Sequence, residues 1–245
     1  MAFRKFLFLS SLLIGLVRVR GKELPDFIRT CARDDPNLTT CMISSVEELR
    51  PYLLKGVPEY NIPSLEPLVM TDFFADEAAG MKIVVSNVSA WGCSDFFVRG
   101  LETNLDTLQF IVDVDIPKLR IEAHYHLDGK LLLVPVKGDG NLETNVTDVS
   151  ARAELQGEII EQNGSKFLTY SQVKLRVHVG GGSVRMENLF NGDKVLLSML
   201  NDVVNRNFKV FLSELMPVIE KSLASVFQNT GNAIVEAFPF DQLFP

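Results

Sequence analysis

Apolar and polar side chains alternate through much of the middle of the chain, from residue 66 to about residue 187. Apolar residues hold the even positions over 108–116, with Ile111 as an exception, and the odd positions over 119–127, 149–155 and 173–179. Because successive side chains of a strand point to opposite faces, this pattern predicts β-strands with one apolar and one polar face. We therefore expect an antiparallel sheet that is buried on one side only.

Proline and glycine punctuate this alternation. The apolar positions change from even to odd across Pro117, which predicts a bulge or a turn, because proline has no N–H to donate to a strand ladder. Sequences of the kind that forms tight turns stand at 128–129, 138–140 and 163–164. We expect hairpin turns at these three places.

The chain switches to helical spacing from residue 191 to about residue 237. Asp193 can cap the first turn, and Pro217 should bend the helix locally. A helix over 194–228 would be about 52 Å long. Since so long an apolar helix needs an equally long apolar cover, we expect the sheet to wrap around it. The apolar stripe consists of Leu196, Leu200, Val203, Val204, Phe208, Phe211, Leu215, Val218, Ile219 and Phe227.

A shorter amphipathic helix is predicted within residues 22–65. Ser44 stands three residues before Glu47, which is the spacing of a capping box at a helix start. Pro51 follows within the same segment, so the helix either kinks there or starts earlier and breaks. Residues 56–63 should form a turn-rich exit from this helix.

The first residues are typical of a secretory signal peptide. Arg4 and Lys5 precede a largely apolar run at 6–17, and Gly21 offers a small residue for cleavage. The alternative is a membrane anchor, but the apolar run rises only about 18 Å against a hydrocarbon core of roughly 30 Å. We expect cleavage of residues 1–21, one mature domain at 22–245, and a secreted, extracellular protein without stable membrane insertion.

The charge balance narrows the possible partners. The chain carries 24 basic and 31 acidic side chains, for a net charge of −7, and removal of the basic leader would make the mature protein more acidic still. Binding to phosphate backbones and to anionic lipid surfaces scales with Lys and Arg contacts. We therefore expect no nucleic acid partner.

Cysteines and glycosylation sequons fit export. Cys31 and Cys41 bracket a short loop, and the oxidising conditions outside the cell favour a disulfide between them. Cys93 is then left over, either as a buried apolar side chain, which we favour, or as an intermolecular bridge. N-x-S/T sequons predict N-glycosylation at Asn37, Asn87, Asn145 and Asn163.

Catalytic and metal-binding motifs are mostly absent from the sequence. All three histidines, His124, His126 and His178, hold polar positions of their strands, so we favour solvated histidines over a metal site. The G-x-S-x-G motif does not occur, and the glycine runs at 138–140 and 180–182 lack the Lys-Ser/Thr of a phosphate loop. We expect no enzyme, no cofactor and no bound metal.

The mature chain resembles the insect takeout and haemolymph juvenile hormone-binding family throughout its length. The resemblance rests on the order and spacing of short motifs, and no single motif carries it. The motifs are the Cys31/Cys41 pair and residues 56–59, 62–68, 129, 131–135, 138–140, 188–193 and 238–245.

This resemblance implies an α+β fold, in which a long C-terminal helix is wrapped by a highly curved antiparallel sheet in a single elongated domain with an apolar tunnel. It also implies a monomeric carrier of a terpenoid hormone, a fatty acid or a similar extended lipid, in hormone-, feeding- or circadian-linked signalling. A second disulfide, which some hormone-binding members carry, is absent because Cys93 has no partner. The expected tunnel residues are Phe110, Val112, Ile121, Tyr125, Val177, Phe208 and Phe211, and Tyr125 or Thr144 could add a polar contact.

Two other functions stay open at this point. A secreted interaction or signalling glycoprotein that acts without a ligand would fill its core with the many phenylalanines and leave no continuous void. A secreted lipid-modifying enzyme would need a polar cluster inside the apolar face of the sheet, which the alternation does not provide. The carrier is the interpretation that we favour.

Overall fold

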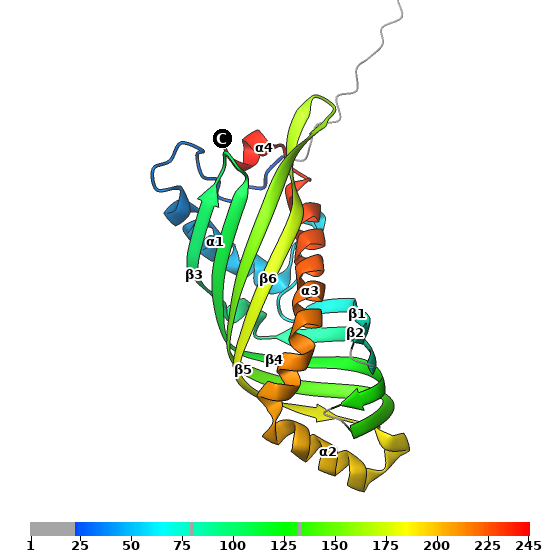
Figure 1. The fold of residues 1–245 in the computed structure, drawn as a ribbon. Helices are drawn as coiled ribbons and strands as arrows, with labels where there is room; N and C mark the ends of the chain where they lie inside the picture. The colour runs from blue at the N-terminus through cyan, green and yellow to red at the C-terminus, as the bar shows by residue number, and fades with distance from the viewer. Residues whose placement is uncertain (1–22, 79–80, 132–133) are drawn as a thin grey trace, which may run out of the picture.

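The computed structural model describes residues 23–78, 81–131 and 134–245, so the expected signal peptide at 1–21 lies outside the described residues. Long strands and a long C-terminal helix run side by side in an elongated molecule (Figure 1). The elements in chain order are α1 (Leu38–Lys55), β1 (Leu68–Ala78), β2 (Met81–Trp91), β3 (Phe97–Asn104), β4 (Gln109–Leu131), β5 (Val134–Gln162), β6 (Ser165–Met186), α2 (Lys194–Arg206), α3 (Phe208–Val235) and α4 (Phe240–Leu243), with short 3-10 turns at Pro58–Tyr60, Cys93–Asp95 and Phe190–Gly192.

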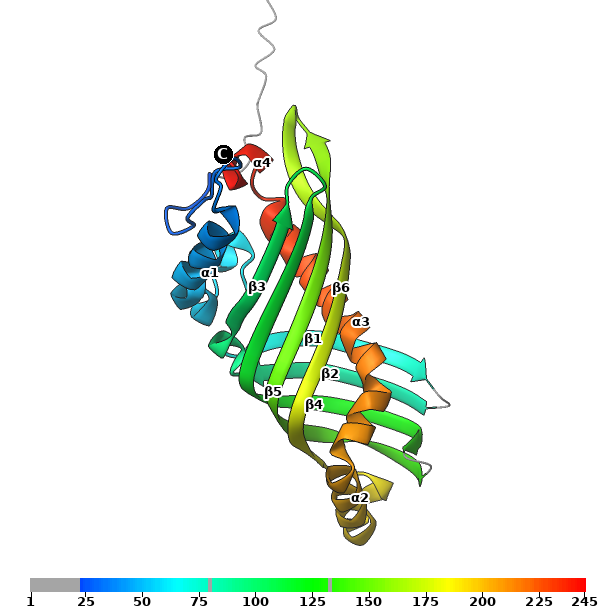
Figure 2. The same ribbon diagram turned by 60° about the vertical axis from the view of Figure 1, so that its left-hand side comes forward.

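The strands form one antiparallel sheet in the order β1-β2-β4-β5-β6. The sixth strand, β3, pairs with residues 109–115 of β4, whereas β2 pairs with residues 120–128 of the same strand. β2 and β3 therefore flank different halves of β4, and the sheet changes direction between its upper and lower parts (Figure 2). The antiparallel sheet expected from the alternation is confirmed, and so is the curvature expected from the need to cover a long apolar helix.

A row of three special residues crosses the sheet where the alternation shifts. Pro117 of β4 lies opposite Asp148 of β5, which lies opposite Gly180 of β6. Asp148 has a positive φ of 52°, and a Cβ added at Gly180 would stand 2.6 Å from the Cβ of Asp148. Each of the three strands thus changes which of its side chains point inward at the same row, while the strand pairing keeps its register. The change of side expected at Pro117 occurs, but the predicted bulge or turn is wrong, because β4 runs through Pro117 and pairs with β5 without a shift of register.

One of the three expected hairpin turns is correct. Residues 163–164 join β5 to β6 with positive φ at both positions, 52° at Asn163 and 80° at Gly164, as a tight hairpin requires. The other two predictions are wrong, because 128–129 lie inside β4 and 138–140 inside β5. The glycines at 138 and 140 instead allow a close approach of the chain: a Cβ at Gly140 would lie 2.3 Å from the carbonyl oxygen of Glu187.

The single helix predicted at 194–228 is two helices. Asp193 caps α2 as expected, accepting hydrogen bonds from the backbone N–H groups of Val195 and Leu196. The break falls at Asn207 and not at Pro217, which lies inside α3. The Asn207 side chain donates to the carbonyl oxygen of Val203 at 2.8 Å, a local bond that competes with helix continuation.

The N-terminal helix starts earlier than the capping-box pattern predicts. α1 begins at Leu38 and runs through Pro51, so Ser44 and Ser45 lie inside the helix and not at its start. Their hydroxyls donate to backbone carbonyls, Ser44 to Thr40 and Ser45 to Arg29. Of the two alternatives at Pro51, the earlier start is correct, but the helix does not end there.

The long helix lies across the open side of the sheet. α3 packs mainly on β6 and also touches β1, and these two strands stand at opposite ends of the strand order. The sheet is not closed into a barrel, and the helix spans its two edges (Figures 1 and 2). The sheet therefore wraps the helix in a particular way. Its two edge strands contact α3, and its middle strands curve away and face α3 from the opposite side.

Candidate functional site

Three clusters of buried apolar side chains lie between the sheet and the helices. The upper cluster, near α4, contains Phe110, Leu168, Phe240 and Phe244. The middle cluster contains Val173, Leu175 and Ala224, in the central part of α3 and β6. The lower cluster joins the lower sheet to α2 and the start of α3 and consists of Tyr125, Leu127, Val136, Val146, Val149, Val184, Met186, Leu189, Leu200, Val204, Phe208 and Phe211.

The seven expected tunnel residues occupy different surroundings. Phe110 belongs to the upper cluster, and Tyr125, Phe208 and Phe211 belong to the lower one, where they are buried. Val177 is half-buried and packs against the lower and middle clusters. Val112 and Ile121 share the inward side of β4 with these residues, yet both stay half-buried and belong to none of the three clusters.

Short side chains line the inner face next to Val112. Val112 pairs with Ala153 of β5, and in the adjacent row Val114 pairs with Ala151, all on the inward parity of their strands and all half-buried. The interface between a sheet and a helix is normally close-packed, and the short side chain of alanine fills little of it. Ala151 and Ala153 pack against the middle cluster, but Val112 and Val114 beside them stay half-buried and belong to none of the three clusters.

Side chains of the two helices fasten the exposed edge of β6. The Asn205 amide bonds both backbone groups of Val184, at 2.9 and 2.8 Å, and Asn201 does the same at Met186. Farther along, Asn232 bonds both backbone groups of Tyr170, at 2.7 and 3.1 Å. Each amide thus replaces the missing neighbour strand. We call this set the seam; it also includes Glu220, which accepts from the backbone N–H of Val177, and Gln228, which donates to the carbonyl of Tyr170.

The seam is not among the features predicted above, although the sequence holds a signal for it. Asn201 and Asn205 are four residues apart, as are Gln228 and Asn232, so each pair lies on one side of its helix. Amides repeated on a mainly apolar helix face need partners there. Their partners on β6 could not be known from sequence spacing.

The chain termini close the upper end of the molecule. Cys31 and Cys41 form the expected disulfide, with an S–S distance of 2.04 Å. Arg33 of the enclosed loop donates its backbone N–H to the carbonyl of Pro245 and forms an ion pair with Asp241 at 3.0 Å. Under this lid lies an apolar cavity of about 170 Å³, lined by Cys31, Met42, Leu168, Tyr170, Val235 and Phe244 among others.

Cys93 is a free thiol, as expected, and it is half-buried. Burial raises its pKa to about 12, and the nearby negative charge of Glu66 contributes to the same shift. The carboxylate of Glu66 itself accepts backbone N–H bonds from Gly92 and Ser94 at about 3 Å; burial opposes its ionisation, but these bonds and the Ser94 hydroxyl lower its pKa overall. Both groups stabilise the turn after β2, and neither has the properties of a nucleophile or base.

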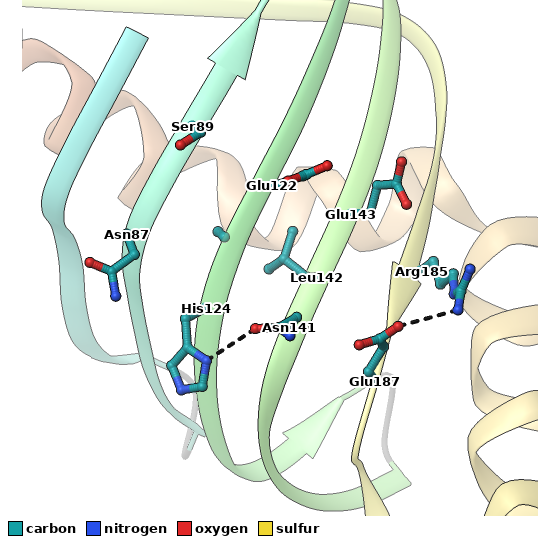
Figure 3. Close-up of a pocket in the computed structure, with 10 residues that line it drawn as sticks. Asn87, Ser89, Glu122, His124, Asn141, Leu142, Glu143, Arg185 and Glu187 are labelled. Carbon is teal, nitrogen blue, oxygen red and sulfur yellow. Dashed lines mark hydrogen bonds and ion pairs between the residues drawn. The ribbon is translucent and has the colours of Figure 1, made fainter. Parts of the chain in front are cut away.

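A polar hollow of about 500 Å³ lies on the outer face of the sheet, on the far side from the helices (Figure 3). His124 and His126 stand beside it and share the carboxylate of Asp139, at 3.1 and 3.2 Å. Among the described residues, no three His, Cys, Asp or Glu side chains are grouped so that they could hold a metal ion. The hollow is lined by Asn87, Ser89, Glu122, His124, Asn141, Glu143, Arg185 and Glu187, with Ala123 and Leu142 at its base.

The polar side chains of β4 are less exposed to solvent than expected. Lys118 and Arg120 are exposed, whereas Glu122, His124 and His126 are half-buried among neighbouring polar side chains. All of them lie outside the apolar interior, so the interior gains no acid, base or metal ligand from this strand.

Of the two candidate polar contacts, Tyr125 lies in the interior. Its hydroxyl donates to the carbonyl of Glu187, and burial, aided by the charges of Asp139 and Glu187, raises its pKa to about 12. Thr144 is half-buried, and its hydroxyl donates to the carbonyl of Ser183 at 2.8 Å. Both hydroxyls therefore donate their proton to the protein backbone. Each can only accept a hydrogen bond from a ligand.

Three of the four sequon asparagines, Asn37, Asn87 and Asn163, are exposed, and Asn145 is half-buried on the polar side of β5. Asn87 sits in a bulge of β2 with a φ of 51°. Such positions are accessible to a glycan, which is the condition that glycosylation requires.

Sequence and structure comparisons place the chain among known proteins. Residues 7–245 match the family model "Haemolymph juvenile hormone binding protein (JHBP)". The chain is 23% identical over 239 residues to the "Circadian clock-controlled protein daywake" of Drosophila melanogaster, covering 93% of this chain and 91% of that protein. It is 20% identical over 220 residues to the "Putative beta-carotene-binding protein" of Schistocerca gregaria, with coverage of 89% and 88%.

The fold is that of a solved structure. The crystal structure of Epiphyas postvittana Takeout 1 superposes with a TM-score of 0.74 at 20% identity, covering 88% of this chain and 98% of that one. Among the described residues, no helix has the length and hydropathy to cross a membrane.

Proposed function

The chain belongs to the haemolymph juvenile hormone binding protein family, and from this membership we propose that it is a secreted carrier of one extended hydrophobic small molecule. The ligand is a terpenoid, a fatty acid or a similar lipid, held between α3 and the inner face of β4, β5 and β6 without chemical change. The proposed walls are Phe110, Val112, Ile121, Tyr125, Val177, Phe208 and Phe211.

One observation carries this proposal, namely the apolar inner face that the protein leaves partly covered. Val112, Val114 and Ile121 face inward but stay half-buried, next to the short Ala151 and Ala153. Folded proteins rarely leave such a strip between a sheet and a helix unfilled. An extended apolar guest would complete the packing of this strip.

The energetics suit a ligand without charged contacts. A terpenoid of about fifteen carbons gains near 12 kcal/mol at roughly 0.8 kcal/mol per buried CH₂, before costs. Association and ordering remove at least about 4 kcal/mol, which leaves at most about 8 kcal/mol, or binding in the micromolar range. The cavity of about 170 Å³ under the upper lid then serves as one end of the site, since it is smaller than the roughly 300 Å³ at which ligand pockets begin.

The relatives' names fit this chemistry. A carotene is a long hydrocarbon, so the name of the Schistocerca relative supports an extended apolar ligand. The name of the Drosophila relative supports a use of the carrier in clock-linked signalling. Secretion, a signal peptide at 1–21, a monomeric state and glycans at the four sequons complete the proposal.

The test fills the proposed site from the sheet side. Ala153→Leu places a larger side chain on the inner face next to Val112, so binding of a fluorescent fatty acid to delipidated protein should fall about tenfold or more, while the protein stays folded. The matched control is Glu154→Leu, which changes the exposed neighbour on the outer face of the same strand. Mass spectrometry of an organic extract of the purified protein identifies the ligand class.

Two results would contradict the carrier. Wild-type protein that stays folded but shows no response to terpenoids, fatty acids or carotenoids would leave the ligand-independent interaction protein as the better interpretation. Equal binding by wild type and Ala153→Leu would show that the ligand lies elsewhere than on the strip around Val112.

A further inference from the structure

The helix α2 carries apolar side chains on two neighbouring sides. One side, with Leu200 at 5% exposure and Val204 at 0%, packs into the lower cluster. The other side points to solvent. The exposed apolar residues there are Val195 (69%), Leu196 (46%), Met199 (60%) and Val203 (42%), with Val210 (54%) following in the first turn of α3.

These residues form a continuous strip. Val195, Met199 and Val203 are spaced four residues apart, and Leu196 lies beside them, so all four share one side of the helix. The prediction that Leu196 and Val203 belong to the stripe that covers the sheet is wrong, because both are exposed. The break at Asn207 turns α2 away from the axis of α3, so one side of α2 faces the sheet and the other faces outward.

The strip lies at an extremity of the molecule. α2 forms the lower end of the elongated fold, at the opposite end from the lid made by the chain termini (Figures 1 and 2). A helix at a tip can touch a broad surface without interference from the rest of the protein. An isolated amphipathic helix face that contacts a lipid bilayer has this arrangement.

Area and charge disfavour a second copy of the chain as the occupant. An exposed helix face of this kind amounts to a few hundred Å², whereas a stable complex buries about 800 Å² on each partner. The net charge of −7 also makes two copies repel each other. A bilayer needs no matching shape, because each apolar side chain that enters it contributes separately.

The charges on the tip suit lipid headgroups better than those elsewhere in the chain. Lys194, Arg206 and Lys209 are exposed there, against the acidic Asp202 and Asp193, whose carboxylate already serves the helix cap. Arg206 lies three residues beyond Val203, where its long side chain can reach a phosphate while the strip is inserted. The acidic remainder of the chain opposes anionic membranes, so the partner is a bilayer of zwitterionic lipid.

We infer that the outer strip of α2 docks the protein, tip first, on the surface of a zwitterionic lipid bilayer. The strip inserts Val195, Leu196, Met199 and Val203 to the depth of the headgroups, and Val210 lies at its margin. Docking stands independently of the carrier. Its use, which is to load or release the ligand at a membrane, rests on the proposed function.

The test compares vesicle binding of two double variants by flotation with phosphatidylcholine vesicles. Leu196→Gln with Met199→Gln removes the strip and keeps good helix formers, so the partition coefficient should fall about tenfold or more. The matched control is Val69→Thr with Phe97→Gln, which removes two equally exposed apolar residues from β1 and β3, at 59% and 61% exposure. The control should float like the wild type.

The outcomes separate docking from carriage. Wild-type protein that does not float, or an equal loss in both double variants, would overturn the docking inference. A loss of self-association in the α2 variant, measured by light scattering without vesicles, would assign the strip to a second copy instead. Fatty-acid binding in vesicle-free buffer is measured in parallel and should be the same in both variants, so failure of the carrier is seen separately.

Discussion

A single half-buried thiol, Cys93, gives a chemical prediction at the scale of one residue. At pH 9, a thiol with the ordinary pKa of 9.0 would be half ionised, whereas with a pKa of about 12 only about one molecule in a thousand carries the reactive thiolate. We expect the native protein to resist alkylation by iodoacetamide at pH 9 and to take up one label after unfolding. Rapid labelling of the native protein would show that burial does not control this group.

The sign of the pH effect follows from the same shift. The folded protein keeps Cys93 protonated up to about pH 12, while the unfolded chain ionises near pH 9. Ionisation therefore favours the unfolded state between these two values, and the stability contributed by the neutral buried thiol is lost as the pH rises through this window.

At the same scale, part of the candidate site could be predicted from the sequence. Phe110 and Tyr125 were found from alternation, because a sheet with one covered face repeats its apolar residues at every second position. The alternation could not show that Val112 is less covered than Phe110, two residues away on the same side. That difference comes from Ala153 across the strand pair from Val112 and from Phe244, whose ring stacks on that of Phe110.

The seam yields a prediction at the scale of elements. Asn232→Ala removes the amide that bonds both backbone groups of Tyr170, and leaving the partly buried N–H unsatisfied should cost about 1 to 3 kcal/mol of unfolding free energy in urea denaturation. The control is Asn229→Ala, at an exposed position of the same helix. Equal unfolding free energies of the two variants would show that the amide bonds of the seam contribute little to stability.

Helix boundaries were the least predictable feature of the elements. Pro217 removes one backbone donor, but it lies in α3 between Leu215, which packs on the lower cluster, and Ala224 of the middle cluster. Packing on both sides outweighs the single lost bond. Asn207 ends α2 because its side chain competes for the carbonyl of Val203, and this competition depends on the direction that the chain must take next.

The disulfide acts at the scale of the whole molecule, because it holds the first and last segments together. The loop that it closes contacts Pro245 and Asp241 through Arg33. Replacing both Cys31 and Cys41 by serine should lower the unfolding free energy by about 2 to 4 kcal/mol and expose the upper end to limited proteolysis first. Cys93→Ser is the control, and an unchanged melting temperature in the double variant would contradict this role.

The architecture of the whole molecule could be predicted only in part. One apolar face of the sheet and one long apolar helix imply that the helix packs on that face, and the structure confirms this contact. The length of the helix predicts that the sheet curves around it, but the form of that curvature requires the strand pairing, which brings Pro117, Asp148 and Gly180 into one row across three strands. Without that curvature, the placement of α3 across both sheet edges could not be foreseen.

The seam has one further consequence, which concerns aggregation. A 22-residue edge strand such as β6 presents a ladder of backbone groups that could template the addition of a strand from another molecule. Asn201, Asn205, Glu220 and Asn232 occupy that ladder at intervals. Because the chain is made from its N-terminus, β6 is complete before α2 and α3 emerge. The nascent protein therefore passes through a stage with an open edge, and the end of that vulnerable stage is set by the arrival of the last helix.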